Sequence, residues 1–347
     1  MPSSTSSSDT SSSELAPRTL WPASWLLALA IVLACIGSWE GFWRSRDFTP
    51  SVTDDAGLWA LARHRANRLG EDAVVLVGSS RMQMDLQQAA FARATGWKPA
   101  LQLAVVRGPS IPVLENLASD PEFRGTVICE VYPTLFFART PQLDHMLDEY
   151  FRAFEEFSVG RRVEQHLSMA FQRSFVTRLP DLAPARLYPA WQRPGRLLPT
   201  YNAVISDDRF RYGDYFKIVN LRAANRANAG IYARTTPKLM TPSEVASRLE
   251  FVEELVGQIQ SRGGQVIFVH LPASLHVLEY ERRWWKRRDT WDRLAATTRA
   301  STVHYLDHPG LAMFDPPDGI HLARDAADVF SQRFGEILVE LSLAPGH

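Results

Sequence analysis

Five short and almost continuous apolar runs restrict most strongly how this chain can fold. They cover residues 73–77, 101–106, 126–131, 265–271 and 302–306. Runs of this kind are typical of central parallel strands, which are covered on both faces. Amphipathic helical patterns accompany them at 58–68, 86–95, 245–260 and 324–341. The alternation predicts an α/β protein with a doubly wound, flavodoxin-like parallel sheet of five strands, whose ligands bind at the carboxyl ends of the strands.

The alternation is interrupted by a long segment, residues 136–247, which divides the core into 73–135 and 248–343. The segment is far longer than a crossover connection, so we expect an insertion with its own structure after the third strand. Its beginning, 144–175, has a helical pattern rich in aromatic residues. Prolines that exclude a long helix follow at Pro180, Pro184, Pro189, Pro194 and Pro199. We expect the insertion to cap the carboxyl edge of the sheet; a purely structural elaboration is the alternative.

An uncharged segment near the N-terminus predicts a membrane anchor. Residues 21–39 carry no charge, and as a helix they would span about 28 Å, close to the hydrocarbon thickness of a bilayer. Tryptophans mark both ends, as in an interfacial aromatic belt: Trp21, Trp25, Trp39 and Trp43. We expect a disordered tail over 1–19, one transmembrane helix over 20–43, and a linker with a first helix over 44–72. A buried core helix is the alternative.

Other interpretations of this segment fit less well. A cleaved signal peptide needs a basic start, and the tail offers only Arg18. A lipoprotein signal ending at Cys35 has a poorly matching sequence before the cysteine. Charge does not fix the orientation, because Arg18 precedes the segment while Arg44 and Arg46 follow it.

The charge balance excludes a protein that is basic throughout, because 38 basic side chains face 38 acidic ones. The balance is uneven along the chain, however. Residues 110–160 hold three basic and nine acidic side chains, whereas 161–240 hold fourteen basic and five acidic ones. If the positive stretch overhangs the ligand-binding edge, it favours an anionic polymer or a lipid headgroup. With no recognised motif, nucleic-acid binding is not expected.

A turn of small residues ends the first apolar run, at Gly78-Ser79-Ser80-Arg81. At the carboxyl end of a first strand, such a turn presents a nucleophile or binds a phosphate. It lacks the glycine spacing of a dinucleotide site and the Gly-Lys-Ser/Thr of a phosphate-binding loop, so no nucleotide cofactor is predicted. It also lacks the Gly-x-Ser-x-Gly pattern of α/β-hydrolases.

A second polar block, Asp318-Gly-Ile-His321, precedes the last helical pattern. A carboxylate three residues before a histidine can hold the imidazole in one tautomer, while the other ring nitrogen faces a serine hydroxyl. A hydroxyl becomes a good nucleophile when such a base takes its proton. Together with the serine turn, the block predicts a catalytic triad; capping of the following helix is the alternative.

With these two blocks the chain resembles the SGNH, or GDSL-like, hydrolase superfamily. The resemblance implies that Ser80 is the nucleophile, with Ser79 where the family has aspartate, and that Asp318 and His321 complete the triad. It also implies an oxyanion-hole glycine after the second strand, a place that Gly108 occupies in LQLAVVRGPS. The family's third block supplies an asparagine donor after the third strand, and here that region reads EVYPTLFF.

The missing asparagine matters because loss of one oxyanion donor costs about 100-fold or more in rate. Two alternatives follow. Another donor replaces it, with Arg81, Ser79 or a group of the insertion as candidates beside Gly108, or activity is weak or absent.

Membrane-anchored members of the superfamily with this layout O-acylate polysaccharides or teichoic acids outside the cytoplasm, as do the alginate acetyltransferases and the D-alanylation protein. They act beside a multispanning membrane-bound O-acyltransferase. The resemblance therefore implies a single-pass protein of the inner (cytoplasmic) membrane with a periplasmic or extracytoplasmic body. Its expected function is that of a serine esterase or O-acyltransferase on acyl groups of an envelope or exported polysaccharide. A multispanning acyltransferase or a polysaccharide synthase is the expected partner.

Two alternative functions remain open. One is a catalytically degenerate domain that binds a glycan or a partner within a polysaccharide synthesis or modification complex. The other is an esterase acting on acylated lipid, with the insertion and the Arg- and Trp-rich segment 282–288 facing the bilayer. For that segment, a solvated helix with its tryptophans packed inward is equally expected.

Further polar residues near strand ends are interpreted as structural. His270 ends the fourth expected strand and Glu130 the third, where a hydrogen-bonded role is at least as plausible as tuning of the site. His304 and His308 flank an aspartate without the spacing or cysteines of a metal site, so no metal is predicted.

Overall fold

The computed structural model describes residues 20–139, 143, 145–192, 203–213 and 221–343. The predicted tail over 1–19 lies outside them, as do Pro194 and Pro199. The chain divides into two compact units, the first ending at Asp47 and the second starting at Phe48. Each unit is described by itself.

The first unit contains helix α1 (Leu20–Arg44). Its segment Trp21–Arg44 is long and apolar enough to cross a membrane, with a mean hydropathy of 1.8 in a window of which no part is buried. Leu26, Leu27 and Leu33 are each more than half exposed. Within the described residues no protein surface covers this apolar helix, which is the opposite of a buried core helix. A single helix that could span a membrane is what the sequence predicted.

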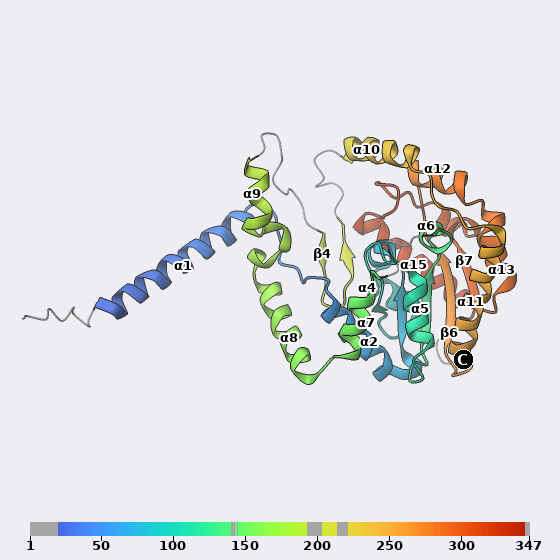
Figure 1. Cartoon of the computed structure of the whole chain (residues 1–347), viewed down its shortest axis with the longest axis horizontal. Coiled ribbons are helices and arrows are strands. Elements are labelled where there is room, and N and C mark those ends of the chain that lie inside the picture. The colour runs from blue at the N-terminus through green and yellow to red at the C-terminus, as the bar shows by residue number, and fades with distance from the viewer. Residues whose placement is uncertain (1–19, 140–142, 144, 193–202, 214–220, 344–347) are drawn as a thin grey trace, which may run out of the picture. The chain divides into compact units, whose positions relative to one another are not determined.

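The second unit is built on a five-stranded, all-parallel sheet with strand order β2-β1-β3-β6-β7 (Figure 1). Its strands are β1 (Val74–Val77), β2 (Leu101–Gln102), β3 (Thr126–Glu130), β6 (Gln265–His270) and β7 (Ser301–His304). All five lie within, or one residue from, the five apolar runs, although β2 is shorter than its run. The flavodoxin-like order is the predicted one.

Helices cover both faces of the sheet, which explains why the strands are apolar throughout. Val75 and Val77 point into one core, whereas Val74 and Leu76 point into the other. The first core is closed by α2 (Ala56–Leu69), α5 (Ser110–Ala118), α11 (Pro242–Gln260) and α13 (Trp291–Thr297). The second is closed by α3 (Ser80–Asp85), α4 (Gln88–Thr95), α14 (Pro309–Ala312) and α15 (Arg324–Glu340). Helix α12 (Leu275–Trp284) follows β6.

Local sequence signals place several helix ends. Thr241 and Glu244 form a reciprocal capping box at the start of α11, where Pro242 is the first helical residue. The Asp55 side chain caps α2. Gly96 ends α4 with a φ of +70°, a conformation that glycine adopts without steric cost.

The insertion between β3 and β6 consists mainly of short elements. They are α6 (Pro133–Phe136), α7 (Asp148–Glu155), α8 (Val159–Ser174), α9 (Pro184–Gln192), β4 (Val204–Ile205), β5 (Arg211–Tyr212) and α10 (Leu221–Arg234). Single 3₁₀ turns lie at Val176–Arg178 and Pro180–Leu182, in the proline-rich stretch.

The described parts of the insertion contact both the flank of the core and the carboxyl edge of the sheet. Helices α7 and α8 pack against α2 at the flank of the core. Arg209, in the β4–β5 turn, is fully buried and donates to the carbonyls of Gln102 and Ala104, at the carboxyl end of β2. Asn225 of α10 donates to the Pro317 carbonyl, next to Asp318. Within the described residues of the insertion, the β4–β5 hairpin, α10 and Phe137 reach the edge at which the insertion was expected.

Candidate active site

The serine turn gives its two serines different environments. β1 ends at Val77, and Ser80 is the first residue of α3. A Cβ on Gly78 would lie 2.5 Å from Glu130 Oε2, so only glycine fits there. The Ser79 hydroxyl caps α3 by accepting a backbone N–H and is buried. Ser80 is only partly buried, so it is the serine that a ligand can reach.

Ser80, His321 and Asp318 form a hydrogen-bonded line. His321 Nε2 lies 2.8 Å from Ser80 Oγ, and His321 Nδ1 lies 2.9 Å from Asp318 Oδ2. Asp318 Oδ1 also accepts the backbone N–H groups of Ile320 and His321. Gly319, with a φ of +100°, makes this tight turn possible. The structure thus brings together the three residues that the sequence predicted as a triad.

The electrostatics of the line suit a base aimed at Ser80. Burial alone would raise the pKa of the Asp318 carboxyl, but its hydrogen bond with His321 and the backbone donors lower the pKa to about 2. The aspartate is therefore ionised at neutral pH and holds the proton of the imidazole on Nδ1. Nε2 is then an acceptor for the Ser80 hydroxyl. The His321 and Asp318 side chains are 15% and 19% exposed, so the site opens to solvent at the histidine.

A buried carboxylate on α3, Asp85, also holds the histidine loop. Asp85 Oδ1 accepts the backbone N–H of Leu322, the residue after His321, at 2.7 Å. Burial raises the pKa of Asp85 well above its usual value. Helix α3 therefore carries the serine at one end and a support for the histidine loop at the other. Asp85 has no local signal in the sequence, because its partner Leu322 is distant along the chain.

Arg81 does not have the expected place of an oxyanion donor. Its side chain is 1% exposed, and Nη2 donates to the carbonyls of Leu271 and Pro272 at 2.6 and 2.8 Å. Its guanidinium also pairs with Glu130 and Glu281, each at 3.5 Å. The guanidinium is thus buried among structural partners rather than offered to an acyl group.

Two carboxylates share this single guanidinium. Burial opposes the charge on Arg81, but Glu130 and Glu281 outweigh it and raise the pKa of Arg81. One guanidinium does not fully compensate two buried carboxylates. Burial and the charge of Glu130 accordingly raise the pKa of Glu281 to about 7, although Arg81 lowers it. Glu281 was not singled out from the sequence, because nothing in its helix α12 distinguishes it from an ordinary surface glutamate.

The other expected oxyanion donors are bonded within the protein. The Gly108 N–H donates to the Val105 carbonyl at 2.7 Å. The backbone N–H and the hydroxyl of Ser79 both donate to Glu130, at 2.6 and 2.8 Å. The Ser80 N–H, by contrast, lies at the first position of a helix, where no intrahelical acceptor exists. The Ser80 amide is thus better placed than Gly108, Arg81 or Ser79 to donate to an oxyanion.

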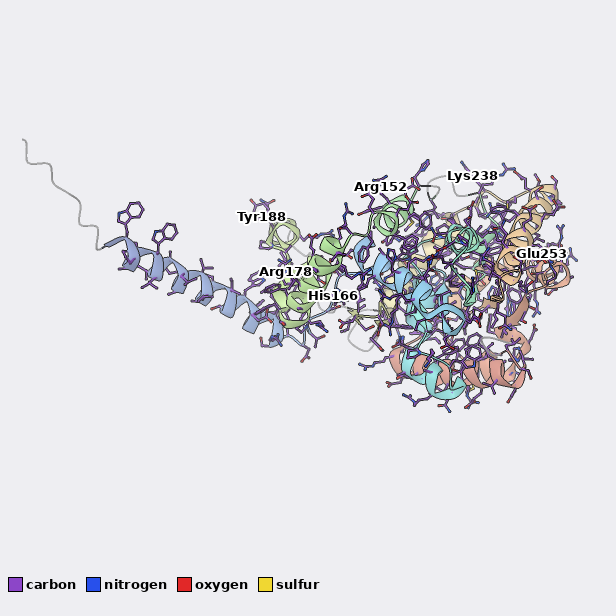
Figure 2. The ribbon with its side chains drawn as sticks, turned by 90° about the horizontal axis from the view of Figure 1, so that it is seen from below. Arg152, His166, Arg178, Tyr188, Lys238 and Glu253 are labelled. Carbon is purple, nitrogen blue, oxygen red and sulfur yellow. The ribbon has the colours of Figure 1, made fainter. Side chains whose placement is uncertain are left out.

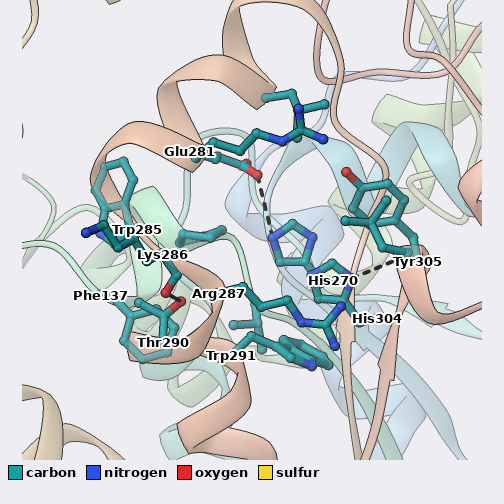
Figure 3. A pocket seen from close by; sticks show the side chains of 15 residues that line it. Phe137, His270, Glu281, Trp285, Lys286, Arg287, Thr290, Trp291, His304 and Tyr305 are labelled. Carbon is teal, nitrogen blue, oxygen red and sulfur yellow. Dashed lines mark hydrogen bonds and ion pairs between the residues drawn. The ribbon is translucent and has the colours of Figure 1, made fainter.

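A second polar cluster lies at the carboxyl ends of β6 and β7. The rings of His270 and His304 stack with centroids 4.5 Å apart, and His270 Nε2 lies 3.6 Å from Glu281 (Figure 3). Burial lowers the pKa of both histidines, that of His304 to about 4, so both rings are neutral at pH 7. A cavity of about 150 Å³ adjoins them, lined in part by Trp285, Trp291 and Tyr305.

Next to this cavity, segment 282–288 has both buried and exposed side chains. Trp285 packs inward and is 5% exposed. Arg287 instead forms partly exposed ion pairs, with both terminal nitrogens on Asp307 at 2.7 Å and Nε on Asp292 at 2.9 Å.

No protein-family model matches the chain, and no curated protein matches it.

Proposed function

We propose that this protein is a serine-dependent esterase or O-acyltransferase of the SGNH type, held to a membrane by α1. The observation that carries the proposal is the contact of 2.8 Å between Ser80 Oγ and His321 Nε2, with Asp318 on the other ring nitrogen. A nucleophile bonded to a base, which is in turn oriented by a third group, is the arrangement that activates a serine hydroxyl.

The proposed reaction proceeds through an acyl-enzyme. Ser80 Oγ attacks the carbonyl carbon of an ester while its proton moves to His321 Nε2. The tetrahedral intermediate collapses when the leaving oxygen takes that proton, and the acyl group stays on Ser80. Water then regenerates the serine and releases a carboxylic acid, or a sugar hydroxyl takes the acyl group. Asp318 stabilises the imidazolium formed in each half.

For the substrate we propose acyl groups of an envelope or exported polysaccharide, with a multispanning acyltransferase or a polysaccharide synthase as partner. This part rests on the resemblance to membrane-anchored SGNH proteins. The same resemblance supports a body outside the cytoplasm.

A second candidate function is a binding subunit that has lost catalysis. The position of Gly108 favours it, because its N–H is bonded to Val105 and no asparagine stands after β3. An oxyanion hole with one preorganised donor would be weak.

A fluorophosphonate probe separates the two functions, because it phosphonylates a serine only when a base activates it. We expect the folded full-length protein to be labelled, and labelling to be lost in Ser80→Ala and His321→Ala. Ser119→Ala, at an exposed position after α5, is the matched control and should be labelled like the unaltered protein. An unlabelled but folded protein would decide for the binding subunit.

The proposed orientation of α1 predicts the activity of a topology reporter. Alkaline phosphatase folds only where its disulfides form, outside the cytoplasm. A fusion after Arg46 should therefore be active, and the same fusion lacking residues 20–43 should be inactive. An inactive fusion after Arg46, present at normal levels, would place the body in the cytoplasm.

A further inference from the structure

Helix α8 presents its apolar side chains away from the body of the protein. The side chains that it buries are Gln165, Met169 and Gln172. Its large apolar side chains are exposed instead: Val159 by 76%, Val163 by 53%, Leu167 by 57% and Phe171 by 59%. A surface helix of a globular domain usually has the opposite arrangement, with apolar residues toward the core. Folding of the body alone therefore does not account for the apolar side of α8.

The four exposed residues form one continuous stripe. They are spaced by four residues, and each such step turns about 40° around the helix axis, so together they cover an arc of about 120°. Past the C-terminal end of α8, Phe175 and Tyr188 are also exposed, by 40% and 57%. An exposed apolar surface of this extent marks a site of interaction with a membrane or a protein.

A short connection ties α8 to the end of the apolar helix α1. The backbone N–H of Thr53 donates to Gln172 Oε1 at 3.0 Å, and Val52 packs in one cluster with Leu58 and Met169. Nine residues lead from Arg44, the last residue of α1, to Thr53. An extended chain spans at most about 3.4 Å per residue, so this link cannot exceed about 30 Å. If α1 crosses a bilayer, the length of this link keeps Thr53, and with it the Gln172 end of α8, within about 30 Å of the end of α1.

The charges around the stripe suit anionic lipid. Arg162, His166 and Arg173 lie along one border of the stripe on α8. Arg178 and Arg186 are exposed in the turns and helix that follow. Figure 2 shows His166, Arg178 and Tyr188 together on the α8–α9 segment. Interfacial helices combine such an apolar side with basic residues, whose long side chains reach the headgroups.

We propose that α8 lies in the headgroup region of an anionic lipid bilayer, with Val163, Leu167 and Phe171 directed toward the acyl chains. This rests on the part of the proposed function in which α1 anchors the chain in a membrane. The helix then forms a second attachment, which restrains the body from rotating about its short connection to α1.

The test uses the full-length chain in vesicles of phosphatidylcholine with one third phosphatidylglycerol. Cys35 is first replaced by serine; Cys129 is buried and stays unlabelled. An environment-sensitive fluorophore is then attached to a cysteine introduced by Leu167→Cys, on the stripe, or by Arg161→Cys, on the polar side of the same helix. We expect a blue shift and quenching by spin-labelled lipid for the fluorophore at 167, and neither at 161.

The negative outcomes are distinguishable. If alkaline carbonate extracts the protein from the vesicles, α1 is not an anchor and the premise fails. If the protein resists extraction but the fluorophore at 167 behaves like the one at 161, the proposal for α8 is wrong. Protection at 167 that grows with the number of chains per vesicle, without quenching by lipid, would show a second copy on the stripe and would also overturn it.

A variant of the exposed apolar stripe tests contact of α8 with lipid without an attached fluorophore. Leu167→Glu combined with Phe171→Glu should leave carbonate resistance and the thermal unfolding midpoint in detergent unchanged, because both side chains are exposed. In anionic vesicles it should speed proteolytic cleavage within α8, whereas Glu164→Gln on the same helix should not. Equal cleavage of the two variants would contradict a lipid-bound helix.

Discussion

Replacing Ser80 with alanine is expected to reduce the turnover of an ester substrate by about 10³- to 10⁶-fold, and His321→Ala by a similar factor. The reason is the contact of 2.8 Å between the two side chains: without either member, no activated oxygen attacks the carbonyl. Because they act as one unit, the double variant should be no slower than the slower single variant. The measurement is kcat on a chromogenic acetyl ester, with folding checked by thermal unfolding.

Asp318→Asn tests the role of the carboxylate without removing its backbone contacts. The amide oxygen can still accept the N–H groups of Ile320 and His321, but the amide nitrogen now faces His321 Nδ1. That nitrogen is a donor, so the proton of the ring moves to Nε2, where it blocks transfer from Ser80. We expect a loss of about 10⁴-fold in kcat. Full activity in Ser80→Ala would show that another nucleophile operates, and full activity in Asp318→Asn would show that the carboxylate is not needed to orient His321.

Arg81→Met is expected to have a large effect on stability and to lower the free energy of unfolding by about 3–5 kcal/mol. The change leaves Glu130 and Glu281 buried without their shared cation. It also leaves the Leu271 and Pro272 carbonyls without a donor. Urea unfolding of the full-length protein in detergent, followed by near-ultraviolet circular dichroism, measures the effect.

The control for this charge deletion is Arg287→Met. Arg287 has more hydrogen-bonded carboxylate contacts than Arg81, but its side chain is 38% exposed and its partners are about half exposed. Pairs of that kind contribute about 0–1 kcal/mol, so we expect a small change. If Arg81→Met and Arg287→Met were equally mild, the buried cluster would not be the support of the serine turn that its contacts indicate.

The pH dependence of stability provides an independent check on the same cluster. Burial raises the pKa of Glu281 from 4.5 in its usual state to about 7, so the folded protein binds a proton there that the unfolded chain has released. The contribution of Glu281 to the free energy of unfolding is therefore fully present below about pH 4.5 and declines as the pH rises toward 7. Glu281→Gln should remove that part of the slope. It should also offset part of the loss in Arg81→Met, because one unpaired charge disappears.

The sheet and the triad could be predicted from the sequence because each has a local signal. An apolar run marks a buried strand wherever it occurs, and Asp318 lies three residues from His321. The buried charges lack such a signal. Glu130 and Glu281 lie 49 and 200 positions from their partner Arg81 in the sequence. Asp85 lies 237 positions from its partner Leu322. Their role depends on which strand ends become neighbours.

Two further features of the structure differ from what the sequence alone predicts, one in backbone hydrogen bonding and one in helix packing. The sequence shows a glycine at position 108, but it does not show that the N–H of this glycine donates to the Val105 carbonyl. Because of that hydrogen bond, the Gly108 N–H is not available as the expected oxyanion donor. The pattern of α8 predicts an amphipathic helix, and only the fold shows that its glutamine side is the buried one. Amphipathic spacing alone does not determine which side of a helix meets the protein.

The position of the insertion has a consequence for how the protein is made. Strand β3 ends at Glu130, and its neighbour in the sheet, β6, begins at Gln265. While the chain is synthesised from its N-terminus, the half-sheet β2-β1-β3 must wait for all of residues 131–264 before its central edge is paired. An unpaired edge of this kind is a template for aggregation, and pairing over such a distance is slow. We therefore expect the β3 edge to be most exposed to aggregation during biogenesis, before β6 is available to pair with it.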